Sequence, residues 1–404
     1  MSEVAHTPQL RFPEFIGEWD VTNFGNISSI KRGASPRPIS SPKWFDKDSS
    51  VGWVRISDVT KSKKYLKKTE QYLSEDGINR SRKVDKGNLI MSICATIGKP
   101  IYTNFNVCIH DGFIVFDSLS EDKGFIYYLL EKIQKKWYRY GQPGTQVNLN
   151  SDIVSSEIFS IPTKPEQQKI AAFLAAVDSK IEQLSKKQEL LGEYKKGAMQ
   201  QIFSQATRFK ADDGSNFPDW EEVKLGNLTH KVGKKNKENI KYPIYSINNQ
   251  EGFRPQSEQF DGLDSNDRGY DISLYKIVNE KTFAYNPARI NVGSIGYSYN
   301  LNKVIVSSLY VCFKTNDELE DLYLLAYLDT DKFNKDILRY EEGGVRQYLF
   351  YENFSQISIP LPGNDEQAKI SNFLSSIDNK IEQVDKQLDE SKQFKKALLQ
   401  QMFV

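Results

Sequence analysis

The side chains best suited to recognising another molecule lie in two glycine-containing segments. They read GQPGTQVNLN at 141–150 and EEGGVRQYLF at 341–350, so their numbers differ by 200. Arg presents paired donors that match guanine in the major groove of DNA, and Asn or Gln matches adenine. Thr-Gln at 145–146 becomes Val-Arg at 345–346, as expected of equivalent loops that read different targets. Hydrogen bonding within the loop is the alternative role for these side chains.

Positive charge gathers in two further stretches, although the whole chain carries a net charge of only +1. Residues 31–99 hold 16 Lys and Arg against 7 Asp and Glu, and residues 224–254 hold 7 against 2. A chain that is neutral overall but locally basic suits site-limited contact with DNA rather than general polyanion binding. We expect the lysines to contact phosphate; a solvated charged loop is the alternative. The candidate DNA contacts are Lys31, Arg32, Arg37, Arg55, Lys63, Lys64, Thr145, Gln146, Asn148, Lys234, Lys235, Asn248, Asn249, Arg289, Arg346, Gln347 and Tyr348.

Catalytic motifs are incomplete wherever they begin. Asn286–Pro287 starts like the Asn-Pro-Pro-aromatic motif of amino-methyltransferases, but Ala288–Arg289 follow. Pro218–Asp219 and Glu222–Lys224 imitate a nuclease pattern at a spacing too short to place the carboxylates on neighbouring strands. The sequence contains neither GxGxxG nor a Walker A motif. We therefore expect no catalytic residue and no cofactor.

Metal binding is not expected either, because the histidines do not cluster with the cysteines. The odd number of cysteines, without CxxC spacing, suits a reducing compartment. No apolar run is long enough to span a membrane and the first residues lack an apolar signal core, so we expect a cytoplasmic protein. The residues concerned are His6, His110, His230, Cys94, Cys108 and Cys312.

Two long helices are expected to position the rest of the chain. Residues 166–203 and 366–403 align without a gap over 38 positions, 200 residues apart. Each contains apolar rows at seven-residue spacing with charges between them, the pattern of a coiled-coil seam. At a rise of 1.5 Å per residue, each helix would be about 57 Å long. The predicted seam residues are Ile170, Leu174, Val177, Ile181, Leu184, Ile370, Leu374, Ile377, Ile381 and Val384.

The natural partner for each apolar stripe is the other copy, since a long helix cannot bury its stripe alone. Polar residues interrupt the rows at Gln188, Lys195, Ser391 and Lys395. Such positions usually fix the register of the pair rather than add stability. The alternative is that each copy is a core helix of a separate globular domain.

The remaining sequence is duplicated as well. RFPEFIGEWDVTNFGNIS near the start returns as NFPDWEEVKLGNLT at 216–229, after which the halves diverge. Short apolar runs in both halves predict strands, and helices are expected at 125–141 and 322–340. Each half closes with Ile-Pro, at 161–162 and 359–360. We expect an α+β fold of two divergent domains, 1–163 and 206–363, alternating with long spacer helices at 164–205 and 364–404, in a pseudo-two-fold internal repeat.

Together these features resemble the DNA-specificity subunit of type I restriction–modification enzymes. The resemblance covers essentially the whole chain and depends on the paired helices, the repeated openings and the Gly-Thr-Gln and Gly-Val-Arg loops. It implies that the two divergent halves are target-recognition domains, each of which reads one part of a bipartite double-stranded DNA target. It also implies that the helices pack antiparallel, that two methyltransferase (modification) subunits dock on them, and that motor–nuclease (restriction) subunits can join. The subunit itself would carry no catalysis.

Two other hypotheses predict different behaviour. A self-contained DNA methyltransferase or nuclease would bind a methyl donor or cleave DNA by itself. A coiled-coil adaptor that binds only proteins would tolerate reversal of the Arg and Lys charges in 31–99.

Overall fold

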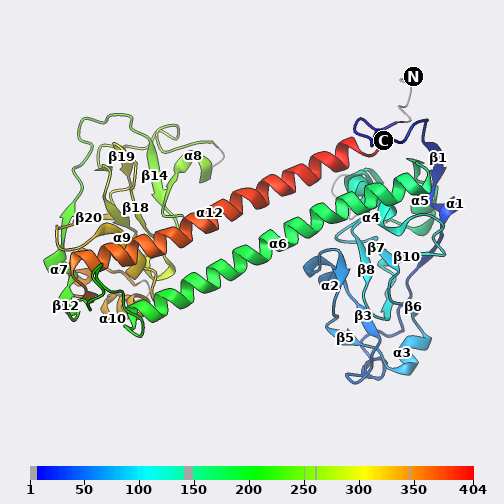
Figure 1. Cartoon of the computed structure of the whole chain (residues 1–404), viewed down its shortest axis with the longest axis horizontal. Helices are drawn as coiled ribbons and strands as arrows, with labels where there is room; N and C mark the ends of the chain where they lie inside the picture. The colour runs from blue at the N-terminus through cyan, green and yellow to red at the C-terminus, as the bar shows by residue number, and fades with distance from the viewer. Residues whose placement is uncertain (1–6, 141–148, 250, 260–261, 345–346) are drawn as a thin grey trace. The chain divides into compact units, whose positions relative to one another are not determined.

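The chain, a computed structural model, divides into two compact units (Figure 1), Met1–Lys186 with Asp385–Val404, and Lys187–Val384. Each unit therefore contains one α+β domain together with parts of both long helices, α6 (Lys164–Phe203) and α12 (Asn364–Gln401). The boundaries between the units fall inside these helices. The structure describes residues 7–140, 149–249, 251–259, 262–344 and 347–404.

In the first unit, two sheets and a short ribbon make up the α+β domain. The sheet orders are β2-β10-β7-β8-β4 and β5-β3-β9-β6, and β1 pairs with β11. The pairs β3–β9 and β4–β8 are parallel, and the other pairs are antiparallel. The elements are β1 (Asp20–Asn23), α1 (Phe24–Ile27), β2 (Ser29–Arg32), η1 (Pro42–Trp44), β3 (Gly52–Val54), α2 (Ile56–Lys61), β4 (Tyr65–Leu66), β5 (Gln71–Tyr72), α3 (Glu75–Asn79), β6 (Arg82–Val84), β7 (Leu89–Ser92), β8 (Pro100–Thr103), β9 (Val107–Ile109), β10 (Phe113–Asp117), α4 (Lys123–Ile133), η2 (Gln134–Tyr140), α5 (Ser151–Ser156) and β11 (Ile158–Ile161).

The second unit repeats this topology, although its sequence diverges after the opening. Its sheets run β13-β20-β17-β18 and β15-β14-β19-β16, β12 pairs with β21, and β14–β19 is again parallel. The first unit therefore differs by the added strand β4. The elements are β12 (Glu221–Lys224), α7 (Leu225–Leu228), β13 (Thr229–Val232), β14 (Ile244–Ile247), β15 (Phe253–Pro255), α8 (Gln256–Gln259), β16 (Lys276–Val278), β17 (Phe283–Tyr285), η3 (Ile290–Val292), β18 (Ile295–Tyr297), β19 (Val304–Val306), β20 (Val311–Thr315), α9 (Asp321–Tyr327), α10 (Asp331–Tyr340), α11 (Tyr351–Phe354) and β21 (Ser358–Leu361).

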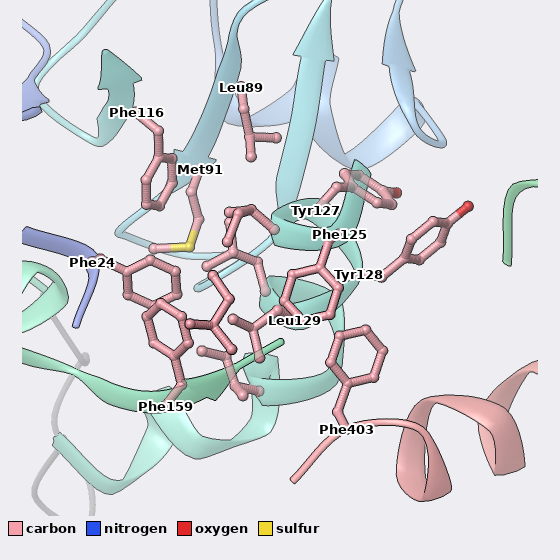
Figure 2. Packing of buried hydrophobic residues seen from close by; sticks show 14 of the residues in the cluster. Phe24, Leu89, Met91, Phe116, Phe125, Tyr127, Tyr128, Leu129, Phe159 and Phe403 are labelled. Atoms are coloured by element: carbon pink, nitrogen blue, oxygen red, sulfur yellow. The ribbon is translucent and has the colours of Figure 1, made fainter. Parts of the chain in front are cut away.

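The central sheet of the first unit is buried on both faces, which explains its continuously apolar strands. Side chains alternate along a strand, so Leu89 and Met91 enter one core while Ile90 enters the other. The first core packs the sheet against α4 and the ends of the long helices, where Phe403 contacts Phe125 (Figure 2). The second core fills the space between the two sheets.

In each unit, the N-terminal part of one long helix lies against the C-terminal part of the other. The first unit packs Ile170 and Leu174 in one core with Leu398 and Met402, and the second unit packs Ile370 and Leu374 with Met199 and Ile202. This is the predicted antiparallel arrangement. Among the predicted seam residues, Ile170, Leu174, Leu184, Ile370, Leu374, Ile377 and Val384 are buried, and Val177, Ile181 and Ile381 are half-buried.

Two of the polar interruptions in the seam form ion pairs between the helices. Lys395 Nζ lies 2.8 Å from Asp178 Oδ1 in the first unit, and Lys195 Nζ lies 2.6 Å from Asp378 Oδ1 in the second. These residues are equivalent under the 200-residue offset. Ser391 instead donates to the Gln387 carbonyl of its own helix. Lys195 and Lys395 therefore contact the opposite helix, and their role in fixing the register stays a prediction.

At the start of each long helix, a glutamate accepts hydrogen bonds from an arginine that lies far earlier in the chain. Arg11 donates to both carboxylate oxygens of Glu166, at 2.7 and 2.8 Å. Arg208 does the same to the buried Glu366, at 3.2 and 2.7 Å, and the Trp220 indole donates to it as well. These paired contacts orient each domain on its helix.

Three local expectations from the sequence need correction. The helix expected at 322–340 is two helices, α9 and α10, because Thr330 caps a new helix by accepting from the Phe333 N–H. The run 303–313 forms two strands, β19 and β20. The counterpart of Pro162 is Pro362, not Pro360: Pro360 lies inside β21, where it faces Glu222, and the Pro162 and Pro362 carbonyls accept from Gln167 and Gln367.

Candidate nucleic-acid interface

Three arginines of the first unit gather at the turn between β9 and β10. Arg32 Nε donates to the Asp111 carbonyl at 2.7 Å, and Arg82 Nε donates to the Arg32 carbonyl at 3.0 Å. Arg37 Nη2 lies 3.8 Å from Asp111 Oδ2. We call Arg32, Ser35, Arg37, Arg82, His110 and Asp111 the arginine surface. It brings together side chains from segments that are distant in sequence.

A glycine allows the chain to cross this turn closely. A Cβ atom on Gly33 would lie 2.0 Å from the His110 carbonyl oxygen, which excludes any other residue without a backbone shift. Gly33 N–H donates to the Phe113 carbonyl at 2.8 Å, and Ala34 N–H donates to the Ile109 carbonyl at 3.0 Å. This crossing places the segment after β2 directly over the turn.

The electrostatics of the turn favour a neutral histidine beside a charged aspartate. Burial lowers the pKa of His110; Asp111 opposes this effect and the charge of Arg55 adds to it. His110 Nδ1 accepts from the Gly112 N–H at 2.8 Å. Burial would raise the pKa of Asp111, but a hydrogen bond from Ser35 and the nearby positive charges hold it below its ordinary value. Asp111 is therefore an ionised acceptor among donors.

The other predicted contacts of the first unit occupy different environments. Arg55 Nε donates to Gln71 Oε1 at 2.6 Å, and Lys31 pairs with Asp117. Lys63 is exposed. Lys64 is not: its ammonium donates to the Tyr128 hydroxyl at 2.8 Å and lies 3.9 Å from Asp178. Lys64 therefore belongs to the helix-packing network, and this position does not suit the phosphate contact expected of it.

In the second unit, the described part of the predicted reading loop at 341–350 lies beside the turn that precedes Arg289. The Leu349 N–H donates to the Pro287 carbonyl at 3.0 Å, which joins the segment holding Gln347 and Tyr348 to the turn before Arg289. Tyr348 exchanges backbone hydrogen bonds with Glu342 and stacks on Phe350. Asn286 Oδ1 accepts from the Ala288 N–H, so the Asn-Pro sequence forms a turn. Arg289 and Gln347 are both exposed.

The remaining candidates of the second unit lie on other loops. Asn248 Oδ1 accepts from the Glu251 N–H, and the exposed Asn249 lies beside Gly293, close to Arg289. The exposed Lys234 and Lys235 follow β13 and run beside β16 instead. Thr145, Gln146, Asn148 and Arg346 lie outside the described residues.

Sequence reasoning missed four members of these surfaces: Ser35, Arg82, His110 and Asp111. A signal for the last two was present, because His110-Asp111-Gly112 separates two apolar runs and Asp-Gly between strands marks a turn; here the turn leads from one sheet to the other. Nothing in the sequence indicated that Arg82 returns to Arg32, since that depends on the order of strands. Among the described residues, no three His, Cys, Asp or Glu side chains gather where a metal ion could be held. None of the described helices is long and apolar enough to cross a membrane.

Comparisons with known proteins agree on one family. Residues 16–191 and 218–391 each match the type I restriction modification DNA specificity domain. The chain is 22% identical to the type I restriction enzyme MjaVIII specificity subunit of Methanocaldococcus jannaschii over 96% of this chain and 92% of that one. A putative MjaX specificity subunit of the same organism is 24% identical, and that match spans 50% of this chain and 49% of the relative.

Solved structures share the fold. The type I restriction–modification S subunit from M. genitalium superposes with a TM-score of 0.58 at 17% identity, over 98% of this chain and 99% of that one. A chain from a study of complex assembly and conformational transition of the type I R-M system has a TM-score of 0.56 at 16% identity, covering 94% and 96%. With two domain matches along one chain, this protein belongs to the type I restriction–modification DNA specificity family and is a specificity subunit with two specificity domains.

Proposed function

We propose that the two domains read the two halves of a bipartite double-stranded DNA target, one half-site each. The supporting observation is that the same strand topology carries different exposed side chains on the loops of the two units. The first unit presents arginines around Asp111, and the second presents Asn249, Arg289 and Gln347. Since the two surfaces differ, the two half-sites need not be related by a palindrome. Arg contacts guanine and Asn or Gln contacts adenine, each good pair discriminating by about 1–3 kcal/mol.

The long helices would act as the spacer between the two readers and as a docking platform. A helix of 40 residues is about 60 Å long, enough to separate readers that face the same side of a duplex one helical turn, about 34–36 Å, apart. Two methyltransferase subunits would dock on the helices, and motor–nuclease subunits would join in the full complex. Adenine methylation and ATP-dependent cleavage would belong to those partners, in the cytoplasm, and this chain would need no cofactor.

Mapping of genomic methylation in cells with and without this gene tests the proposal. Two short specific tracts around an indifferent spacer should be methylated only when the gene is present. Replacing 206–363 with the corresponding part of a relative should change one tract and leave the other unchanged. A single contiguous site, or methylation that persists without the gene, contradicts the proposal.

The two competing hypotheses give different results in the same system. A self-contained methyltransferase or nuclease requires methyl-donor binding or cleavage by the purified chain alone. An adaptor that binds only proteins requires normal methylation after charge reversal at Arg32 and Arg37. Both exposed arginines lie beside Asp111, so their reversal would also test the arginine surface directly.

A further inference from the structure

We propose that Asp111 selects a base with an exocyclic amino group, cytosine N4 or adenine N6, in the half-site read by the first unit. This inference rests on the proposed DNA-reading function and adds a specificity-determining acceptor to it. Positively charged donors are attracted to the phosphates of DNA of any sequence. A carboxylate, in contrast, is tolerated only where the DNA offers a hydrogen-bond donor. The side chain that limits what the arginine surface accepts is therefore its single acid.

The geometry leaves one oxygen of Asp111 free to make such a contact. Oδ1 accepts from the Ser35 hydroxyl at 2.8 Å. The cation nearest to Oδ2 is Arg37 Nη2, at 3.8 Å, beyond hydrogen-bond length. The Asp111 side chain is 49% exposed at the tip of the β9–β10 turn. Among the residues that the structure describes, none donates a hydrogen bond to Oδ2, so this oxygen has room for a donor from DNA.

The turn also holds this oxygen in a defined position. Gly112 N–H is bonded to His110 Nδ1, and the His110 ring contacts Phe113 and Trp53. Ser35 locks the carboxylate from the other side. A side chain fixed in this way can discriminate between bases, because it cannot rotate away from an unfavourable partner without losing the Ser35 bond.

Base chemistry then limits the partner. In the major groove, cytosine and adenine present amino donors, whereas guanine N7 and O6 and thymine O4 are acceptors. A carboxylate facing acceptors or phosphate would stay unpaired at the interface, which disfavours binding. Within the described part of the chain, the turn occupies only Nε of Arg32, and Arg37 lies 3.8 Å from Asp111, so both guanidinium groups have nitrogens left for acceptors on adjacent bases.

The test is to select binding sites from a randomised DNA library with the full chain co-purified with its partner subunits. Asp111→Ala removes the acceptor without adding a donor, so a preference of about 5- to 150-fold at one base pair of the first half-site should be nearly lost. The other positions, the second half-site and the spacing should not change. Asp85→Ala is the matched control, because it removes the same charge at a carboxylate that is 74% exposed, just after the C-terminal end of β6.

Each other outcome decides the matter. If Asp111→Ala weakens binding to the first half-site uniformly but keeps every base preference, Asp111 only positions Arg37 and the inference is wrong. If the first half-site is lost altogether, Asp111→Glu decides: an unchanged base preference at lower affinity supports the inference, and an altered one overturns it. A wild-type complex that selects no bipartite site would instead refute the proposed function.

Discussion

Replacing Lys395 with Met tests whether the buried ion network holds the helix pair in register. Lys395 Nζ lies 2.7 and 2.9 Å from the two Glu131 oxygens and 2.8 Å from Asp178 Oδ1. Tyr128 adds a hydrogen bond of 2.6 Å to the other oxygen of Asp178. Burial alone would lower the pKa of Lys395, but the two carboxylates raise it above its ordinary value, so the ammonium stays charged at neutral pH.

The magnitude follows from what the substitution leaves behind. Among the described residues, Glu131 would lose its ion-pair partner, and Asp178 would keep only Lys64, whose ammonium lies 3.9 Å away. Removing one partner of a buried pair costs about 3–5 kcal/mol. The side chains retain 15, 29 and 24% exposure for Lys395, Glu131 and Asp178. Water offsets part of the loss, so we expect about 2–3 kcal/mol. For a unit of this size that is a fall of about 5–10 °C in melting temperature, measurable by calorimetry of the full chain.

The chain contains its own control at the equivalent position. Within the described part of the chain, Lys195 forms an ion pair only with Asp378, whose side chain is 52% exposed. Lys195→Met should therefore cost no more than about 1 kcal/mol. Glu131→Gln added to Lys395→Met should recover part of the lost stability, because it removes one stranded charge. Equal losses for Lys395→Met and Lys195→Met, or no recovery in the double variant, would refute this account.

Two further predictions use the titrating groups of the units. Burial raises the pKa of Cys108 to about 12 and of Cys312 to about 11, so a thiol reagent should modify the half-buried Cys94 first. Mass spectrometry of the native chain checks this order. Reaction at Cys108 or Cys312 before Cys94 would be the contrary result. The folded-state pKa of His110 is lowered by burial, so the unfolded chain binds its proton first and stability should fall as pH drops below about 6.5. His110→Gln should flatten that fall in chemical denaturation, and an unchanged slope would show that other groups cause it.

The helical frame could be predicted because its signal is local. Ile170 and Leu174 repeat at heptad spacing, and their copies Ile370 and Leu374 lie at the same offset, so neither requires knowledge of the tertiary fold. Lys395 was recognised as an interruption of the seam for the same reason. That Glu131 of α4 completes its ion network could not be predicted, because α4 reaches the helices only through the packing of the first core.

The members of the arginine surface were predicted in part, and one cause explains which residues the sequence could not assign. Local charge excess pointed to Arg32 and Arg37, which do lie together. The same excess included Lys64, since a run of lysines does not show which one faces the helices. Arg82 was missed because it joins the others only through the β6–β9 pairing, in which it lies opposite Ile109. The charge composition indicates which stretch of sequence contributes to the arginine surface, whereas the order of the strands decides which residues lie together on it.

Under the proposed function, the residues that hold each domain on its helix are separate from those that read DNA, which would allow one fold to read two unlike targets. Residues that hold the domain on its helix are repeated in both halves: Arg11 with Glu166 has its counterpart in Arg208 with Glu366. These contacts lie at the helix starts, away from the β9–β10 turn that bears Asp111. A substitution at that turn can therefore alter what is read at little cost to the frame. Conversely, loss of the Arg11–Glu166 or Arg208–Glu366 contact should weaken binding to a half-site without changing the base sequence that is preferred there. A binding selection therefore distinguishes the two kinds of residue.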